Sequence, residues 1–321
     1  MLRVEVRPFR RTDGAQVTAL VNRHAAAVVP GVAASVNAVL GQFEREPEEV
    51  IVDPWVAERR AVVAEQAGAI AAAALLVRYR DDPDVGTDYR NAGEIRWLLF
   101  LPAAPAENPY WEDGWAAARA LMASCLDQFR RWAVGRVYAD GALPVPAVYG
   151  VPEQWPHVAR LYEESGFPPP ARWESVSIAD LAHVAPPDVE PSARLRQLRV
   201  RRAVGVNGTR LSALSGDDEV GYLEVEVLEP AQRHPRLGGL ADVGNLYVAE
   251  PYRRQGVASW LLAHAAWWLR LGHVDRLLYY AGPDETDQLA FAVSRGFVEL
   301  TRTRRGWTRR GWTAGRCCAG R

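Results

Sequence analysis

The feature of this chain that most constrains its fold is an order of elements that occurs twice. Apolar periodicity predicts strand–strand–strand–helix–strand–helix–strand in each half, and Gly-Phe follows the last helix of each (Gly166-Phe167 and Gly296-Phe297). In the first copy we expect strands at 55–65, 69–79 and 93–101, a helix at 114–133, a strand at 137–139 and a helix at 155–166. A strand at 4–9 and two helices within 14–45 come before this copy. The second copy is expected at 195–204, 219–228, 241–248, 257–271, 276–281 and 284–294. The pattern predicts an internal duplication of one α/β (α+β) fold.

A proline-rich stretch separates the two copies. It runs through Pro186 and Pro187 to Pro191, and such a run is typical of a connection between domains. We therefore expect an N-terminal domain at 1–184, a linker at 185–192, a C-terminal domain at 193–313 and a tail at 314–321. Near the end, the pentapeptide Thr-Arg-Arg-Gly-Trp occurs twice in succession, at 303–307 and 308–312. Residues 301–321 hold seven arginines and no acid, and we expect the tail to be disordered.

Composition excludes several classes of protein. The formal net charge is −1, so no overall field favours nucleic acid or an acidic membrane. The three cysteines, Cys125, Cys317 and Cys318, show neither a disulfide framework nor the spacing of a metal site. No apolar run has the length of a membrane span or the form of a signal peptide. We expect a cytoplasmic protein that needs no metal and does not act on a membrane.

The segment 245–258 carries the strongest chemical signal. An apolar strand ending in Leu-Tyr-Val runs through a turn into a basic loop with one glycine, and a helix of about fifteen residues follows. The first amides of a helix lack intrahelical partners, and its dipole favours an anion there. Gly256 permits a close approach of the backbone, while Arg253 and Arg254 add positive charge. This arrangement suits a pyrophosphate.

In this context Arg253-x-x-Gly256-x-Ala258 resembles the acyl-CoA-binding motif of the GNAT (GCN5-related N-acetyltransferase) family. The resemblance implies two tandem GNAT-like domains, each a mixed, mostly antiparallel central sheet flanked by helices. It also implies acetyl-CoA, or another acyl-CoA, as co-substrate, with direct attack by an amine on the thioester. The cofactor-binding residues implied are Leu246, Tyr247, Val248, Arg253, Arg254, Gln255, Gly256, Val257, Ala258 and Ser259. The amide of Val248 would donate to the developing oxyanion.

An attacking amine must lose a proton, and strand carboxylates are the candidates for general base. Asp242 lies four residues before Leu246, where the family often has an acid, and Glu224 and Glu226 on the neighbouring strand are alternates. Each of them could equally be a solvated strand carboxylate. The family often has a tyrosine as general acid four residues before the glycine that ends the last helix. That position is Ala292 here, a departure that puts the catalytic set in doubt, and Tyr280 or its neighbour Tyr279 is the possible substitute.

The first copy shows the reverse pattern. Tyr162 and Glu94 stand at the positions of the acid and the base, but the loop before the helix carries Trp111, Glu112 and Asp113. Two carboxylates beside a pyrophosphate would repel it. We therefore expect this half not to bind CoA, or to bind it poorly, and to help shape the acceptor pocket.

Three functions remain open at this point. The leading prediction is an acyl-CoA-dependent N-acyltransferase that acts on a small-molecule amine or a peptide, as a monomer or homodimer. The alternatives are a CoA-binding sensor without turnover, and a nucleic-acid-associated protein that uses the arginine-rich tail. The sequence identifies neither the acceptor nor the acyl chain length.

Overall fold

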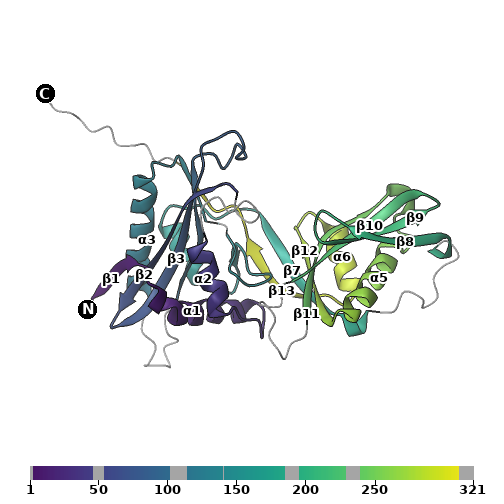
Figure 1. Ribbon diagram of the computed structural model, residues 1–321, viewed down its shortest axis with the longest axis horizontal. Coiled ribbons are helices and arrows are strands. Elements are labelled where there is room, and N and C mark those ends of the chain that lie inside the picture. Colours follow the sequence, from purple (N-terminus) through teal and green to yellow (C-terminus); the bar gives the residue numbers. More distant parts are fainter. Residues whose placement is uncertain are drawn as a thin grey trace. The chain divides into compact units, whose positions relative to one another are not determined.

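The computed structural model describes residues 3–45, 54–101, 114–139, 141–184, 195–228 and 239–310. The expected linker, the expected tail, and the loop that contains Trp111, Glu112 and Asp113 lie outside these residues. The chain divides into two compact units (Figure 1). Unit 1 comprises Met1–Trp173 together with Thr303–Arg321, and unit 2 comprises Glu174–Arg302.

Unit 1 is built on a six-stranded sheet in the order β1-β2-β3-β4-β5-β14. Its strands are β1 (Val4–Pro8), β2 (Val56–Gln66), β3 (Ala69–Tyr79), β4 (Ala92–Phe100), β5 (Arg136–Tyr138) and β14 (Thr308–Arg310). A further short strand, β6 (Val151–Pro152), lies outside this sheet and pairs with Thr303 and Arg304. Its helices are α1 (Gly14–Val28), α2 (Val36–Glu44), α3 (Trp115–Arg131) and α4 (Pro156–Glu164). Figure 1 shows α1 and α2 on one side of this sheet and α3 on the other, so both faces of the central strands are covered.

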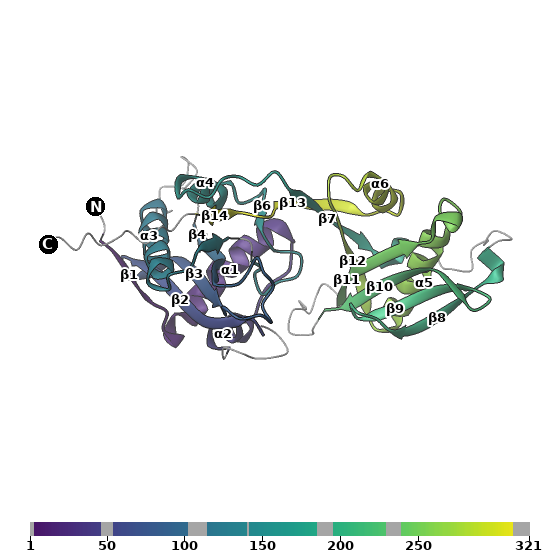
Figure 2. The same ribbon diagram turned by 90° about the horizontal axis from the view of Figure 1, so that it is seen from above.

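Unit 2 has strands in the order β13-β7-β12-β11-β10-β9-β8. These strands are β7 (Trp173–Asp180), β8 (Leu198–Val204), β9 (Thr209–Ser215), β10 (Asp218–Val227), β11 (Gly239–Val248), β12 (Val274–Ala281) and β13 (Val298–Arg304). Its helices are α5 (Val257–Leu271) and α6 (Thr286–Ser294). Figure 2 shows α5 along the strands β9 to β12, and apolar residues of α5 and of these strands form one buried core. As expected from the sequence, no pair of helices like α1 and α2 occurs in the described part of unit 2.

Two strands belong to a different unit than the sequence suggests: β7 lies in unit 2 and β14 in unit 1. The limits of the units therefore differ from the expected 1–184 and 193–313. β7 precedes the proline-rich stretch, yet it pairs antiparallel with β12 over six residues, from Arg276↔Asp180 to Ala281↔Ser175. The chain end returns to unit 1, where β14 pairs with β5. β12 and β5 thus each gain a neighbouring strand, β7 and β14, that satisfies their backbone hydrogen-bonding groups although it is distant in sequence.

The first copy of the repeated pentapeptide ends in the core of unit 1. Trp307 is completely buried, with its ring 5.7 Å from that of Tyr162, and its carbonyl accepts a hydrogen bond from Ala139. Arg305 lies over the ring of Tyr149, and Arg309 donates to the carbonyl of Ser165. These described residues of the arginine-rich segment therefore serve to fix the chain end to unit 1. No helix among the described residues is long and apolar enough to cross a lipid bilayer.

Candidate active site

The central strands of unit 2 separate halfway along their length. β11 and β12 run parallel and pair from Gly239↔Val274 to Asp242↔Leu278, after which β11 continues unpaired on that side to Val248. The register of β11 with β10 shifts at the same place, because Glu224 pairs with Asn245 while the next residue pairs with Val243. Gly244 is therefore an extra residue that bends β11, as in a β-bulge. The bend opens a gap between two neighbouring strands of the sheet.

The backbone of β11 beyond the bulge offers hydrogen-bonding groups to this gap. The amide of Ala249 donates to the Val220 carbonyl on β10, so the alternation of a strand directs the amides of Leu246 and Val248 the other way. Leu246 and Val248 are half-buried, and Tyr247 is exposed. An extended ligand could pair with this edge as an added strand does.

The loop after β11 leads into the start of α5, where backbone amides lack intrahelical partners. It contains a short 3-10 helix, Glu250–Tyr252, and ends at Gly256, which precedes α5 with a φ of +88°. Arg254 also has a positive φ of 60°, unusual for a residue with a side chain. The amide of Trp260 is the first to pair within α5, with the Gly256 carbonyl, which leaves the first-turn amides of 257–259 available to an anion.

The side chains of this loop differ in direction. Arg253 donates from Nε to the Val248 carbonyl at 3.0 Å, which ties the basic loop to the end of the open edge. Arg254 is exposed, and its guanidinium lies 4.0 Å from Asp287 at the start of α6. Gln255 instead donates to the Pro251 carbonyl at 2.6 Å and lines a cavity of about 310 Å³ behind the loop, together with Tyr252. Of the cofactor-binding residues expected from the sequence, Gln255 is thus placed to support the loop with its side chain rather than to hold phosphate.

Asp242 is the last residue of β11 that pairs with β12, so it lies at the closed end of the gap. It is partly buried, its Oδ1 has no hydrogen-bond partner, and Glu226 stands directly opposite on β10. Burial, with the charge of Glu226 as a smaller cause, raises the pKa of Asp242 to about 6. A carboxylate with this pKa is half-ionised at pH 6 and mostly ionised at neutral pH, so it can accept a proton efficiently there.

Glu224, the other carboxylate expected to be catalytic, has a structural environment. It is fully buried and accepts hydrogen bonds from Asn245 Nδ2 at 2.8 Å, from the amides of Val206 and Asn207, and from Arg210. Burial alone would raise the pKa of Glu224, but these hydrogen bonds hold it below its usual value. A carboxylate held by four donors is a poor base, and it instead fixes the 205–208 turn to β11 beside the bulge.

Tyr280 is close to Asp242, as a substitute acid would need to be. It lies on β12 two residues beyond Leu278, the partner of Asp242, and therefore on the same face of the sheet. Burial, followed by the charge of Asp242, raises the pKa of Tyr280, so the phenol keeps its proton. Tyr279 points to the opposite face, where its hydroxyl donates to Gln288 and its ring packs on Phe297. Ala292 is buried in the core, so α6 brings no hydroxyl to this position.

The same strand geometry occurs in unit 1, but the gap is filled. β4 and β5 pair as far as Glu94↔Tyr138, and a register shift follows at Arg96, which makes Glu94 the counterpart of Asp242. The Tyr79 hydroxyl donates to Glu94, and Arg96 lies 3.1 Å from the same oxygen. Beyond the shift, residues 97–100 are buried. A Cβ on Gly141 would lie 2.3 Å from the Arg96 carbonyl oxygen, so backbone packs tightly against β4 here.

A second contact closes the far end of β4 in unit 1. The ring of His157, on α4, packs 4.9 Å from that of Phe100, and its Nε2 lies 3.1 Å from Nε2 of the buried His24. Burial lowers the pKa of both histidines to about 4, so the pair is neutral at physiological pH. Residues 139–155 separate β5 from α4, whereas only residues 282–285 separate β12 from α6. The longer connection provides the atoms that occupy this region of unit 1.

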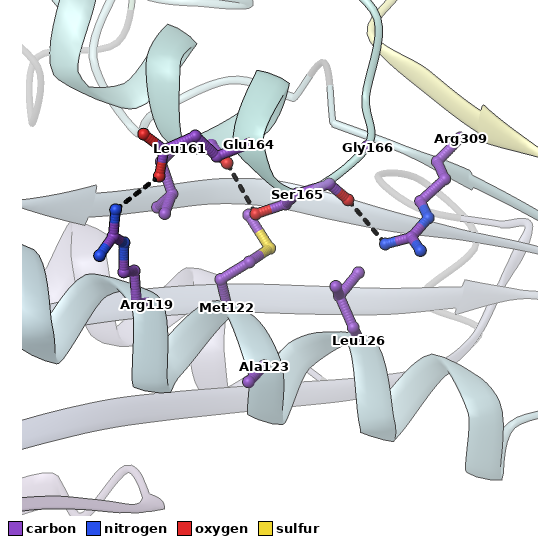
Figure 3. A pocket seen from close by; sticks show the side chains of 9 residues that line it. All are labelled: Arg119, Met122, Ala123, Leu126, Leu161, Glu164, Ser165, Gly166 and Arg309. Atoms are coloured by element: carbon purple, nitrogen blue, oxygen red, sulfur yellow. Dashed lines mark hydrogen bonds and ion pairs between the residues drawn. The ribbon is translucent and has the colours of Figure 1, made fainter.

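Unit 1 has a shallow groove of about 470 Å³ between α3 and α4 (Figure 3). Figure 3 shows the Arg119–Glu164 ion pair, at 3.0 Å, across one end and Arg309 donating to the Ser165 carbonyl, at 2.7 Å, at the other. Leu126 lines the apolar wall between them. These polar contacts hold the chain end and α4 in place. The carboxylate that lines the groove, Glu164, is paired with Arg119 and Arg160, unlike the unpaired Oδ1 of Asp242.

Sequence reasoning missed three parts of the site. Gly244 is the bulge in β11, and a glycine inside a strand pattern was the available signal for it. Asn245 donates a hydrogen bond to Glu224. Glu174 lies on β7 and acts electrostatically on Tyr280, but the expected boundaries placed this strand in the other domain. No group of residues suited to a metal ion occurs among those that the structure describes.

Comparison with known proteins agrees with this geometry. Residues 176–297 match the model of the acetyltransferase (GNAT) family, and no curated protein sequence matches the chain significantly. A tandem GNAT protein from the clavulanic acid biosynthesis pathway superposes with a TM-score of 0.63 at 15% identity, covering 96% of this chain and 98% of its own. A GCN5-related N-acetyltransferase from Sphaerobacter thermophilus gives 0.55 at 15% identity, covering 94% of each chain.

A larger protein shares the same arrangement. The glucosamine N-acetyltransferase region of a fungal multi-domain GH3 β-N-acetylglucosaminidase gives a TM-score of 0.61 at 15% identity, over 95% of this chain. This chain spans only 38% of the length of that protein. At such identities the likeness describes the fold, which confirms the prediction of two tandem GNAT-like domains of mixed sheets and helices.

Proposed function

Because residues 176–297 form a domain of the acetyltransferase (GNAT) family within a tandem GNAT fold, we propose that this chain is an acyl-CoA-dependent N-acyltransferase. Its simplest form is an N-acetyltransferase with acetyl-CoA as co-substrate and a primary amine, on a small molecule or a peptide, as acceptor. Turnover is assigned to unit 2. Cytoplasmic location and a monomeric or homodimeric state remain predictions from the sequence.

One observation carries this proposal: β11 separates from β12 at Asp242 and leads, through the Gly256 loop, into the start of α5. The open edge suits an extended arm with amide groups, and the loop suits a pyrophosphate. The two features are consecutive along the chain, as binding of one long ligand requires. Leu246, Val248 and the first-turn amides of α5 would make the backbone contacts, with Arg253 and Arg254 adding charge.

The residues around the gap can perform each proton transfer. The co-substrate supplies an acyl group activated as a thioester. The acceptor ammonium loses a proton and then attacks, so that a C–N bond forms and the C–S bond breaks. In this mechanism Asp242 accepts the first proton from the ammonium, the Val248 amide donates to the developing oxyanion, and Tyr280 protonates the leaving sulfur. The nitrogen loses its second proton as the C–S bond breaks, and that proton restores the Tyr280 phenol. One oxyanion donor can lower the barrier by roughly 3 kcal/mol.

The environment of Glu94 supports confining the reaction to unit 2. Its carboxylate is engaged by Tyr79 and Arg96, and the edge of β4 beside it is buried. Among the residues of unit 1 that the structure describes, Glu94 is therefore not free to act as a base, and the edge of β4 beside it is not accessible. We expect unit 1 to contribute no turnover.

A second candidate is a CoA-binding sensor without turnover, which Ala292 favours because α6 brings no general acid. The two functions differ in acceptor-dependent release of the CoA thiol, measured with a thiol reagent on acetyl-CoA and a panel of amines. We expect thiol release in the wild type, and a decrease of about 100-fold or more in Asp242→Asn with acetyl-CoA binding retained. Binding without thiol release for any amine would instead identify a sensor.

A further inference from the structure

Four ionisable side chains form a row across unit 2 on the face opposite α5. Glu226 stands directly opposite Asp242, and Tyr280 follows two residues beyond the β12 partner of Asp242. On β7, Val176 pairs with Tyr280, so Glu174 lies two residues further along the same face. The row therefore crosses β10, β11, β12 and β7 at the place where the sheet opens.

The electrostatic balance of this row is negative. The three charges that act most strongly on Tyr280 are Asp242, Glu174 and Glu226, and the charge of Glu226 also acts on Asp242. Arg276 lies on the same face of β12, four residues before Tyr280. The charges that act on it are those of Asp275 and of Asp180, which stands directly opposite on β7. The closed end of the gap, where Asp242 lies, thus carries carboxylates in excess of the one that a general base requires.

The contact between Glu226 and Asp242 is unfavourable unless a cation joins them. Directly opposite residues of an antiparallel pair have Cβ atoms about 4.5–5.5 Å apart, and like charges there destabilise the sheet. Glu226 is exposed, so a ligand can reach it, whereas Asp242 is partly buried beside the gap. A molecule with two amino groups a few bonds apart could reach both carboxylates at once.

We propose, on the basis of the function proposed above, that the acceptor is a diamine-like molecule with a second positive charge, and that Glu226 binds this charge. The reacting nitrogen lies at Asp242, to which it gives a proton before attack, while the second ammonium keeps its protons and pairs with Glu226. Glu174 adds to the negative field from the other side of Tyr280. Glu226 is then a specificity-determining residue, and Asp242 is the base.

The test compares two acceptors of nearly equal size, 1,4-diaminobutane and 4-aminobutan-1-ol, with acetyl-CoA and thiol release as the readout. The second compound keeps the reacting amine but replaces the second cation by a neutral hydroxyl. We expect the wild type to favour the diamine by about tenfold in kcat/KM, mostly through KM, the size of one charge-assisted contact. Glu226→Gln should abolish this preference, because a neutral amide cannot make the charge-assisted contact.

A matched control removes another carboxylate from the same strand. Asp218 is exposed at the start of β10, and Asp218→Asn should keep the preference for the diamine. Equal use of the two acceptors by the wild type, or a preference that survives in Glu226→Gln, would overturn the inference and leave the acyltransferase function standing. If acetyl-CoA binds but no amine releases thiol, both the inference and the transferase function are contradicted.

Discussion

At the scale of single residues, environment separates carboxylates that the sequence presents as equivalent. Glu224 and Asp242 lie on neighbouring strands on the same face. Glu224 has four hydrogen-bond donors and a lowered pKa, whereas Asp242 has an oxygen without a partner and a pKa of about 6. The number of donors around each carboxylate therefore decides which one can exchange a proton.

The raised pKa of Asp242 predicts a limb in the pH profile. The base must be ionised to accept a proton, so kcat/KM should rise with pH up to about 6 and level off above it until the acceptor or another group titrates. Kinetics of thiol release from pH 4.5 to 8 would measure this limb. A profile without an inflection near pH 6 would exclude Asp242 as the general base.

The same group predicts a gain in stability on substitution. Because the pKa of Asp242 is higher in the folded chain than its ordinary value of 3.8, the folded state loses stability as pH rises from about 4 to 6. Above pH 6 the ionised carboxylate remains a cost of about 1–3 kcal/mol. Asp242→Asn should therefore raise the free energy of unfolding by this amount at pH 7.5 while activity falls. Unchanged stability in urea unfolding would contradict the assigned environment.

The environment of Glu224 predicts a loss of stability on substitution, the opposite of what we expect for Asp242. Replacing one carboxylate oxygen by an amide group in Glu224→Gln turns an acceptor into a donor that faces other donors. We expect a loss of about 1–3 kcal/mol in the free energy of unfolding. The lowered pKa implies that the contribution of Glu224 is present above its ordinary value of 4.5 and is lost as pH falls below it. A variant as stable as the wild type would show that the clamp on the 205–208 turn is unimportant.

At the scale of elements, the sequence predicted most helices and strands, but it missed β9 (Thr209–Ser215) and the partners of distant strands. The helix expected at 257–271 is α5, because its amphipathic pattern and the preceding Gly256 are local signals. The exchange of β7 and β14 was not foreseen, because pairing depends on which edge is open after folding. The bulge at Gly244 was also missed, although Asp242 and Glu94 were correctly expected to occupy equivalent positions.

The role of the chain end in unit 1 can be tested on Trp307. Because this side chain is completely buried, Trp307→Ala should cost about 3–5 kcal/mol of stability. The matched control is Trp267→Ala on α5, where the side chain is 55% exposed and the cost should stay within about 1 kcal/mol. Thermal unfolding of both variants measures the difference. Equal midpoints would show that the 303–310 segment does not contribute to the core.

At the scale of the whole molecule, the two copies of the fold differ in what lies beside their parted strands. In both copies two parallel strands stop pairing at a carboxylate, which is Asp242 in unit 2 and Glu94 in unit 1. Among the residues that the structure describes, unit 2 keeps an accessible edge after that point, whereas in unit 1 residues 97–100 are buried and the backbone at Gly141 packs against Arg96. We therefore expect one acyl-CoA site per chain, although the chain holds two copies of the fold.

Calorimetric titration with acetyl-CoA tests this central claim most directly, with Gly256→Trp and a control, Gly68→Trp, beside the wild type. Both glycines have a φ between +80° and +88°, so the backbone strain is matched, but Gly68 lies in the β2–β3 turn of unit 1. We predict one site per chain in the wild type and the control, and none in Gly256→Trp. Two sites per chain, or binding that survives in Gly256→Trp, would contradict the account.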